Sequence, residues 1–430
     1  MTLIDLGELT EPTDPQPPRP QRRPSGRGRQ WPLALMALAM LVVLTAAAPP
    51  AARVHATVPG GLAADLFLSE DHIFTITPAP RVTDGSRELT AYARPRRATV
   101  TPQRLVPLWR MPVAPGIRFF RMEDTAAGVL LSLVPSQDLG RSSETILLDA
   151  ATGQQRWRSA GFGTRDASGR VLLQTWAVQQ STTLRSVEVA TGRELWSRTL
   201  PPSWVEHHQR DGVIDAIVVS TAAGDVEVLD ARTGQLRDRL PAADSTGYQQ
   251  SSVVDDLLLV VRNSRTITAY DLAGLVPRWQ TTVPLADHVT RCGALLCART
   301  NRGGTHVIDP VAGDVRWSTS EDGDLLRVTS TRALAQLGES GLVTLDAATG
   351  EVVTEYGSWE TVASYEQELR LLGIHLLPEV GAVLARLDPA EAQPRRLDVL
   401  PGVVGDCQSR YDLIACRRQS GDFGLWQLPD

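Results

Sequence analysis

Leu147-Leu148-Asp149-Ala150-Ala151-Thr152-Gly153-Gln154-Gln155-Arg156-Trp157 is the stretch that decides the fold of this chain. It predicts a strand, a tight turn at Thr152-Gly153 and a second strand that contains Trp157. Glycine supplies the positive φ that a short hairpin turn needs, and the side chains of Asp149 and Thr152 can hydrogen-bond the turn backbone. The stretch is therefore expected to form a β-hairpin.

The same pattern recurs along the chain. Successive turn glycines from Gly153 to Gly350 are separated by 39, 42, 40, 39 and 37 positions. A repeat of about 40 residues that contains several short strands is typical of a β-propeller. The predicted turn residues are Asp149, Gly153, Gly192, Asp230, Gly234, Asp271, Gly274, Asp309, Gly313, Asp346 and Gly350.

An apolar residue, Asp, Ala-x-Thr-Gly and then Trp four positions after the Gly resembles the repeat of the PQQ-type (quinoprotein-like) β-propellers. The resemblance covers most of the chain after about Gly61 and implies that each Trp packs between two blades. Asp238 and Thr354 stand where the pattern has Trp, so different contacts are expected there. The blade-docking residues are then Trp109, Trp157, Trp196, Trp279 and Trp317.

The complete pattern predicts an all-β fold: an eight-bladed β-propeller over residues 63–430, with seven blades as the alternative. Continuous apolar runs such as Leu257–Val261 suit strands covered on both faces by neighbouring blades. Degraded first and eighth units contain His72–Thr77 and Val383–Leu387. Phe423–Leu428 is predicted to close the ring, because an open ring would expose an unpaired strand edge.

One segment near the C-terminus remains ambiguous. Glu366–Leu377 fits either a short amphipathic helix inserted between blades or a pair of strands.

The N-terminal part of the chain has a different composition. Residues 1–30 are rich in Pro, Arg, Gly and acidic residues and predict a disordered cytoplasmic tail. Residues 31–48 are apolar and uncharged, and about 18 residues at 1.5 Å each approach the thickness of a bilayer. They predict a transmembrane signal-anchor helix, followed by a stalk over residues 49–62.

The charges that flank this apolar segment predict its orientation. Five arginines precede it closely and only Arg53 follows closely, which places the N-terminus in the cytoplasm and the propeller outside the cell membrane. A cleaved signal peptide is the alternative, with Val54-His55-Ala56 as a loose cleavage site. The long region before the apolar segment favours an uncleaved, single-pass anchor.

Composition excludes one class of partner. The chain has 430 residues with a formal net charge of −6, and all of its 43 basic residues are arginine. A negative net charge and a pI near 5.7 argue against a nucleic-acid surface. The 42% of hydrophobic residues can bury a large core.

Four cysteines form two local pairs in the sequence: Cys292 with Cys297, and Cys407 with Cys416. An even number of cysteines on the predicted outer side of the membrane indicates two disulfides. Zinc binding is the rival interpretation, but CxxC spacing and a nearby His cluster are both absent from the sequence.

The sequence contains few candidate catalytic or metal-binding motifs. The sequence lacks GxSxG, HExxH, a Walker loop and a GxGxxG that follows a strand. His207 and His208 beside Glu206 could ligate a metal, but adjacent residues of a strand point to opposite faces. Glu321–Asp324 could offer oxygen ligands to calcium, but it lacks the regular acids of an EF-hand loop and is better explained as a turn.

The resemblance also raises the possibility of quinone-dependent oxidation. Quinoprotein dehydrogenases, the resemblance implies, are longer and carry a catalytic Asp beside a calcium site and often a vicinal Cys-Cys pair. The sequence has no such pair, and its repeated Asp residues are explained as turn formers. We therefore expect no enzyme activity, no metal and no cofactor, with a PQQ-dependent or other ligand-binding oxidoreductase-like propeller as the alternative.

A binding scaffold is the remaining class. Propellers present loops on a rigid ring around a central funnel. The resemblance implies that non-enzymatic members act as assembly factors in bacterial envelopes. The sequence therefore predicts a membrane-tethered, extracytoplasmic scaffold with an envelope protein partner, and it does not indicate the oligomeric state.

Overall fold

The computed structural model describes residues 54–79, 84–97, 99, 101–136, 143–175, 181–242, 249–321, 323–338, 341–364 and 371–429. They belong to one compact unit, Arg53–Asp430. The predicted tail and transmembrane segment belong to a separate unit, Met1–Ala52, and lie outside the described residues. Within the described ranges, no helix is long and apolar enough to cross a membrane.

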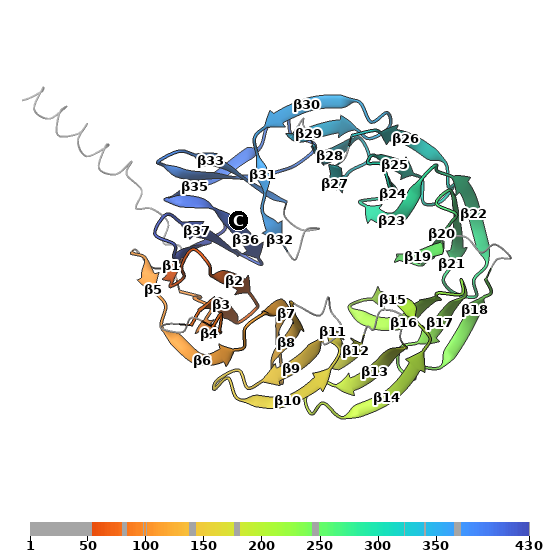
Figure 1. Cartoon of the computed structure of the whole chain (residues 1–430). Helices are drawn as coiled ribbons and strands as arrows, with labels where there is room; N and C mark the ends of the chain where they lie inside the picture. Colours follow the sequence, from red (N-terminus) through yellow and green to blue (C-terminus); the bar gives the residue numbers. More distant parts are fainter. Residues whose placement is uncertain are drawn as a thin grey trace, which may run out of the picture. The chain divides into compact units, whose positions relative to one another are not determined.

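The described strands form nine sheets that follow one another around a ring (Figure 1), and eight of them are purely antiparallel. Eight sheets have four strands each, and we number them as blades in chain order. Blade 1 contains β2 (Asp65–Leu68), β3 (His72–Pro78), β4 (Arg87–Ala93) and β6 (Pro107–Val113); blade 2 contains β7 (Ile117–Thr125), β8 (Gly128–Pro135), β9 (Glu144–Leu148) and β10 (Gln155–Ala160); blade 3 contains β11 (Phe162–Arg165), β12 (Arg170–Thr175), β13 (Thr182–Glu188) and β14 (Glu194–Leu200); blade 4 contains β15 (Ser203–Arg210), β16 (Val213–Thr221), β17 (Val226–Asp230) and β18 (Leu236–Leu240).

The other four blades repeat this arrangement, with the first strand nearest the centre of the ring (Figure 1). Blade 5 contains β19 (Gln249–Val254), β20 (Leu257–Arg262), β21 (Thr266–Asp271) and β22 (Pro277–Thr282); blade 6 contains β23 (Ala286–Cys292), β24 (Leu295–Thr300), β25 (Thr305–Ile308) and β26 (Val315–Thr319); blade 7 contains β27 (Gly323–Val328), β28 (Arg332–Leu337), β29 (Gly341–Asp346) and β30 (Val352–Gly357); blade 8 contains β31 (Glu360–Thr361), β33 (Leu372–Leu377), β34 (Gly381–Arg386) and β35 (Arg395–Pro401).

The ninth sheet joins the two ends of the described chain, and we call it the closing sheet. Its order is β32 (Ala363–Ser364), β36 (Val403–Arg410), β37 (Leu413–Arg418), β38 (Phe423–Gln427), β1 (His55–Val58) and β5 (Gln103–Arg104). Strand β1 pairs antiparallel with β38, whereas the two-residue strands β32 and β5 add in parallel at the two edges. The outer part of this sheet is thus supplied by the beginning of the propeller, which hydrogen-bonds the ring shut.

The core lies between adjacent blades. The second strand of each blade is buried on both faces, which explains continuous apolar runs such as Val129–Leu131 and Leu258–Val261. One cluster joins Phe74 and Ile76 of blade 1 to Val129 and other residues of blade 2. Each blade therefore completes the core of its neighbour, so the ring is stabilised as a whole.

The all-β propeller prediction is confirmed, and the eight predicted units are the eight four-stranded blades. Phe423–Leu428, predicted to close the ring, contains β38 of the additional closing sheet. The predicted stalk over residues 49–62 is wrong at His55–Val58, because these residues form β1 and bury Ala56 and Val58 in the core. The helix considered for Glu366–Leu377 is wrong for Leu372–Leu377, which is β33; residues 365–370 lie outside the described ranges.

Candidate interaction site

The predicted blade-docking tryptophans all contact the turn of the following blade. Each indole Nε1–H donates a hydrogen bond to the carbonyl of the residue that follows the turn Asp, or the Glu in its place. The pairs are Trp109 with Ala150 (2.9 Å), Trp157 with Val189 (2.8 Å), Trp196 with Ala231 (3.1 Å), Trp279 with Pro310 (2.8 Å) and Trp317 with Ala347 (2.9 Å). This bond joins successive outer strands around much of the ring.

The turn glycines are required by two constraints at once. Gly153 has φ of +70°, and a Cβ atom on it would lie 2.6 Å from the ring of Trp109. A side chain would therefore strain the backbone and also displace the indole. The same close approach joins Gly192 to Trp157, Gly234 to Trp196, Gly313 to Trp279 and Gly350 to Trp317.

The repeated aspartates act within these turns. Asp149 Oδ1 accepts hydrogen bonds from Ala151 N (3.1 Å) and from Thr152 N and Oγ1 (both 3.0 Å), and its Oδ2 accepts one from Arg156 (2.5 Å). The Arg156 bond is the largest cause that lowers the pKa of Asp149 to about 2. Asp230, Asp271, Asp309 and Asp346 make related bonds to their own turns. The repeated carboxylates therefore accept hydrogen bonds within the turns that precede the outer strands.

Both predicted disulfides are present. Cys292–Cys297 closes the β23–β24 hairpin with a Cα–Cα distance of 5.8 Å. Cys407–Cys416 joins β36 to β37 across the closing sheet with a Cα–Cα distance of 4.1 Å. All four cysteines are therefore structural, and the zinc interpretation is wrong.

The residues of the His207-His208 motif separate as the alternation of a strand predicts. His208 is buried, and its Nδ1 lies 2.5 Å from Asp215 Oδ1. Burial lowers the pKa of His207 and raises the pKa of Glu206, whose Oε2 accepts a hydrogen bond from Val253 N (2.7 Å). No group of three His, Cys, Asp or Glu side chains among the described residues could hold a metal ion. Asp322 of the Glu321–Asp324 motif lies outside these residues.

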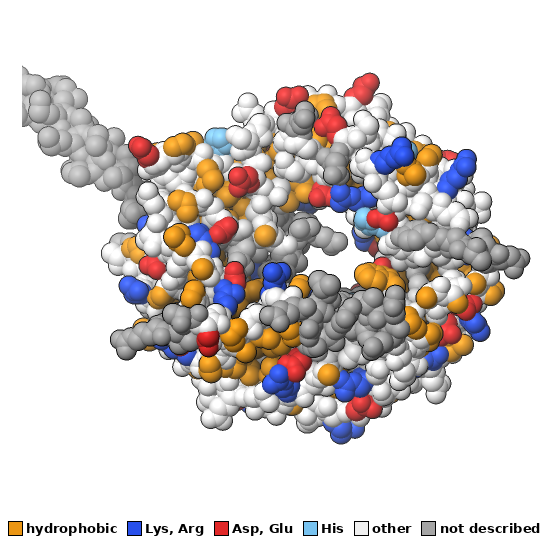
Figure 2. Space-filling view, in the orientation of Figure 1, with side chains coloured by type: hydrophobic (Ala, Val, Ile, Leu, Met, Phe, Trp, Pro, Cys, Tyr) orange, Lys and Arg blue, Asp and Glu red, His pale blue; other side chains and the backbone are white. Residues whose placement is uncertain are grey.

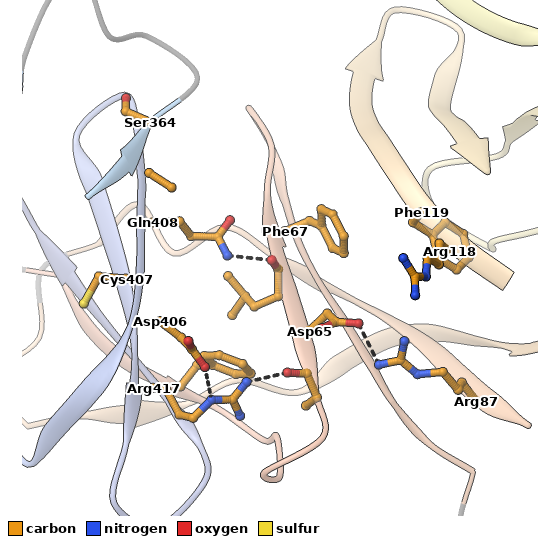
Figure 3. A pocket seen from close by; sticks show the side chains of 14 residues that line it. Asp65, Phe67, Arg87, Arg118, Phe119, Ser364, Asp406, Cys407, Gln408 and Arg417 are labelled. Carbon is orange, nitrogen blue, oxygen red and sulfur yellow. Dashed lines mark hydrogen bonds and ion pairs between the residues drawn. The ribbon is translucent and has the colours of Figure 1, made fainter. Parts of the chain in front are cut away.

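A cavity lies where the closing sheet meets blades 1 and 2, and we call it the seam cavity. Its volume is about 760 Å³. It is lined by residues of strands β2, β4, β7, β32, β36, β37 and β38, and Figure 3 shows side chains from both sides of the seam directed into it. The lining combines aromatic rings such as Phe67 and Phe119 with three arginines and two aspartates.

Side chains of the closing sheet cap the exposed edge of β2. The carbonyl of Ala64 accepts a hydrogen bond from Arg417 (2.5 Å), that of Leu66 from Gln408 (2.6 Å) and that of Leu68 from Arg410 (2.9 Å). Alternate carbonyls of a strand lie on the same edge, so these three bonds form a regular series. The seam is thus joined by backbone-directed side chains instead of by a tryptophan.

The charges of the cavity are only partly paired. Arg87 bonds Asp65 at 2.7 Å, and Arg417 bonds Asp406 at 2.6 Å and lies over the ring of Phe423. Arg118 of β7 is exposed, and its guanidinium has no hydrogen bond or ion pair to any other described residue. Figure 3 shows its guanidinium beside Phe119, on the opposite side of the view from Gln408, with no bond drawn to another residue of the lining. The described lining therefore carries one cation in excess.

Exposed aromatic side chains continue from the cavity along the inner strands. Phe120, next to Phe119 on β7, is 55% exposed and meets the Phe162 ring of β11 edge-on at a centroid distance of 6.2 Å. Trp204 of β15 is 58% exposed. Figure 2 shows that the ring is open at its centre, with charged side chains of both signs around the opening. Blades 2, 3 and 4 thus present aromatic surface on their inner strands.

Sequence reasoning did not identify Arg118, Gln408, Arg410 or Arg417 as site residues. They lie outside the repeated Asp-Thr-Gly-Trp pattern, and the cavity forms only when distant parts of the chain meet at the seam. The one available signal was the predicted ring closure by Phe423–Leu428, which requires residues near the C-terminus to lie beside blade 1.

Residues 107–319 match the family model described as outer membrane protein assembly factor BamB. The PQQ-type propeller repeat recognised in the sequence is thereby supported. None of the curated proteins compared with the chain matches it. Solved structures that resemble this one include BamB from Moraxella catarrhalis (12% identity, TM-score 0.45, 84% of this chain and 93% of that chain covered). Others are Sqt1 from Saccharomyces cerevisiae (10%, 0.47, 88% and 96%) and a europium-containing methanol dehydrogenase (13%, 0.39, 63% and 72%).

The described residues do not fit the quinone and calcium site that the resemblance to quinoprotein dehydrogenases implies. Such a centre needs several oxygen ligands directed at one ion. The two aspartates of the seam cavity each bond an arginine, and the repeated turn aspartates are spread over the outer strands. The cavity offers surfaces for binding, formed by aromatic rings and arginines.

Proposed function

We propose that this chain is a membrane-tethered, extracytoplasmic β-propeller that acts as a protein–protein interaction scaffold in the bacterial cell envelope, without enzymatic activity of its own. The observation that carries the proposal is the seam cavity, which combines aromatic rings with an arginine free of described partners on a rigid ring. Aromatic and arginine side chains dominate the energetics of protein interfaces. The match of residues 107–319 to a family described as an assembly factor supports the same class of function.

The two disulfides support a location outside the cytoplasm, because disulfides form and persist in oxidising compartments. Uncleaved anchoring by residues 31–48 also suits the closing sheet. Cleavage after Ala56 would remove the first two residues of β1 and their pairing with β38.

The proposed scaffold is tested by photo-crosslinking on intact cells. A photoreactive amino acid replaces Phe120 on an inner strand of the full chain, and a second variant carries it at Val311 in an outer turn. Both positions are well exposed, at 55% and 87%, so accessibility alone does not distinguish them. We expect a reproducible envelope protein to be crosslinked from Phe120 and not from Val311. Equal capture from both positions, or none from Phe120, would contradict an interaction surface on the inner strands.

The disulfides and the topology are tested by labelling with a membrane-impermeant maleimide. In denatured protein the four cysteines should resist labelling until a reductant is added, and labelling without reductant would refute the disulfides in the cell. For topology, Val311→Cys places a thiol at an exposed position, which should react on intact cells, whereas reaction only after lysis would refute the extracytoplasmic location. Dye-linked oxidation of an alcohol or sugar by the purified full chain with added quinone would contradict the non-enzymatic role.

A further inference from the structure

We propose that the seam cavity binds an extended, carboxylate-bearing segment of the partner protein, and that Arg118 pairs with the carboxylate. This inference rests on the scaffold function proposed above and specifies its binding chemistry. The carboxylate is an Asp or Glu side chain or the C-terminus of the partner.

Charge is the first argument. The cavity lining contains Arg87, Arg118 and Arg417 against Asp65 and Asp406. Two arginines are neutralised by ion pairs of 2.7 Å and 2.6 Å, whereas Arg118 has no partner among the described residues. A guanidinium that already faces a cavity can bond a carboxylate through two parallel N–H groups. The complementary ligand is therefore an anion of planar, bidentate geometry.

The apolar part of the lining is the second argument. Phe119 is buried, adjoins Arg118 and belongs to the same cluster as the partly buried Phe67. Phe423 is buried on the far side beneath Arg417, at 4.6 Å from the guanidinium carbon to the ring centroid. Aromatic walls beside a cation suit an apolar side chain adjacent to a carboxylate. A simple inorganic anion would leave these walls unused.

The volume of the cavity and the hydrogen bonding of its strand edges indicate how the segment binds. A volume of about 760 Å³ lies within the range of small-ligand sites and accommodates a few side chains of an extended peptide. Strand β32 shows that an extended segment can lie against β36, because Ala363 pairs with Gln408 in parallel. The β2 edge is less available, since the carbonyls of Ala64, Leu66 and Leu68 already accept side-chain bonds. Recognition on the β2 side therefore relies on side chains instead of strand addition.

The test uses the full chain in intact cells, with the photoreactive amino acid at Phe67 inside the cavity. Three forms are compared: Arg118, Arg118→Glu and Arg118→Lys. A charge-assisted hydrogen bond contributes about 1.5–3 kcal/mol, so reversal should lower the yield of crosslinked partner about tenfold or more. Lysine retains the charge and should restore much of the yield. Arg110→Glu on the outer strand β6 is the matched control and should leave the yield unchanged.

Sequencing of the crosslinked peptide supplies the specific readout. We expect a segment with Asp, Glu or the chain terminus within a few residues of the attachment point. Replacing that acid by Arg should abolish crosslinking to the Arg118 protein and restore it to Arg118→Glu. Recovery in this charge exchange would establish the pairing, because a merely structural role of Arg118 would not produce it.

The remaining outcomes separate the two proposals. Capture from Phe120 that is insensitive to Arg118→Glu, with no capture from Phe67, would overturn the cavity inference and leave the scaffold function intact. No capture from either position would overturn both. A crosslink to a second copy of this chain, or to a segment without a carboxylate, would overturn the inferred partner chemistry. Equal thermal unfolding of the Arg118 variants would verify that the ring remains folded.

Discussion

The boundary between blades 3 and 4 and the boundary between blades 4 and 5 are packed by different side chains. Between blades 3 and 4, Trp196 lies against Gly234 and bonds the carbonyl of Ala231 at 3.1 Å. Between blades 4 and 5, Asp238 stands at the Trp position, and no described heavy atom lies within 4 Å of where a Cβ on Gly274 would be. The comparison shows that a turn glycine with positive φ occurs both with and without an indole packed against it.

The blade 4–5 boundary is closed by the turn itself. Leu272 occupies the position held by Ala231 in the previous turn, is 4% exposed, and packs with Val218 and Val228 of blade 4. The extra apolar volume therefore comes from the following blade instead of the preceding one. The blade 7–8 boundary, where Thr354 replaces Trp, uses a third solution: Tyr356 donates a hydrogen bond of 2.6 Å to the carbonyl of Glu391.

The largest expected effect is at a boundary that keeps its tryptophan. Trp317 is 7% exposed and also bonds Ala347, so Trp317→Ala leaves a cavity and an unpaired carbonyl. We expect a loss of about 3–5 kcal/mol in the free energy of unfolding, measured on the full chain by denaturant titration. Trp204→Ala, at an exposed position, is the control and should change stability by no more than about 0.5 kcal/mol. Equal losses would show that the boundary contact contributes little.

Leu272→Ala should be the next most damaging change. If Leu272 replaces the missing tryptophan, its truncation should cost about 2–4 kcal/mol, because buried leucines lose both transfer energy and packing. Leu236→Ala, on the outer strand β18 of blade 4 and 47% exposed, is the control and should have a much smaller effect. A small loss at Leu272 would mean that blades 4 and 5 are held together mainly by their inner strands.

The sequence predicted the tryptophan boundaries well because each depends on local residues at constant spacing. An acidic residue (Asp, or Glu188 in one unit), the turn glycine and the Trp recur at these boundaries, so period and chemistry could be inferred together. Leu272 and Tyr356 were not predicted, because an apolar or aromatic residue near a turn does not by itself indicate a boundary contact. The seam was also beyond sequence reasoning: Arg417 and Ala64 are more than three hundred residues apart and meet only when the ring closes.

The two glycines provide a direct comparison with the same substitution. Gly234→Ala and Gly274→Ala share the cost of a positive φ, +70° and +84°, which is of order 1 kcal/mol. Only at Gly234 would the new Cβ also meet an indole ring, at 2.7 Å. We expect Gly234→Ala to be less stable than Gly274→Ala by about 1–3 kcal/mol in thermal or denaturant unfolding. Similar losses would show that the indole moves aside without cost.

The smallest expected effect is on the stability of the protein in acid. Acid unfolding tests whether the hydrogen bonds of a turn Asp depend on the tryptophan that packs against the same turn. The Arg316 hydrogen bond is the largest cause that lowers the pKa of Asp309 to about 2, and the Arg278 bond lowers the pKa of Asp271. A lowered pKa stabilises the folded state above the unfolded value of 3.8, and this contribution is lost as the pH falls from there toward about 2. Both turns have this feature, although only the Asp309 turn contacts a tryptophan.

We therefore expect the unfolding midpoint to depend less on pH, between about pH 4 and 2, in Asp309→Asn and in Asp271→Asn than in the parent. The two effects should be similar and modest, because both carboxylates are largely solvated. Thermal unfolding of each variant and of the parent across this range provides the measurement. If only Asp309→Asn changes the slope, the tryptophan and the turn carboxylate are coupled, and the loss of Trp at the blade 4–5 boundary has altered the turn as well. If both change it equally, the turn forms independently of its neighbour, which explains how the Gly274 turn persists without the indole.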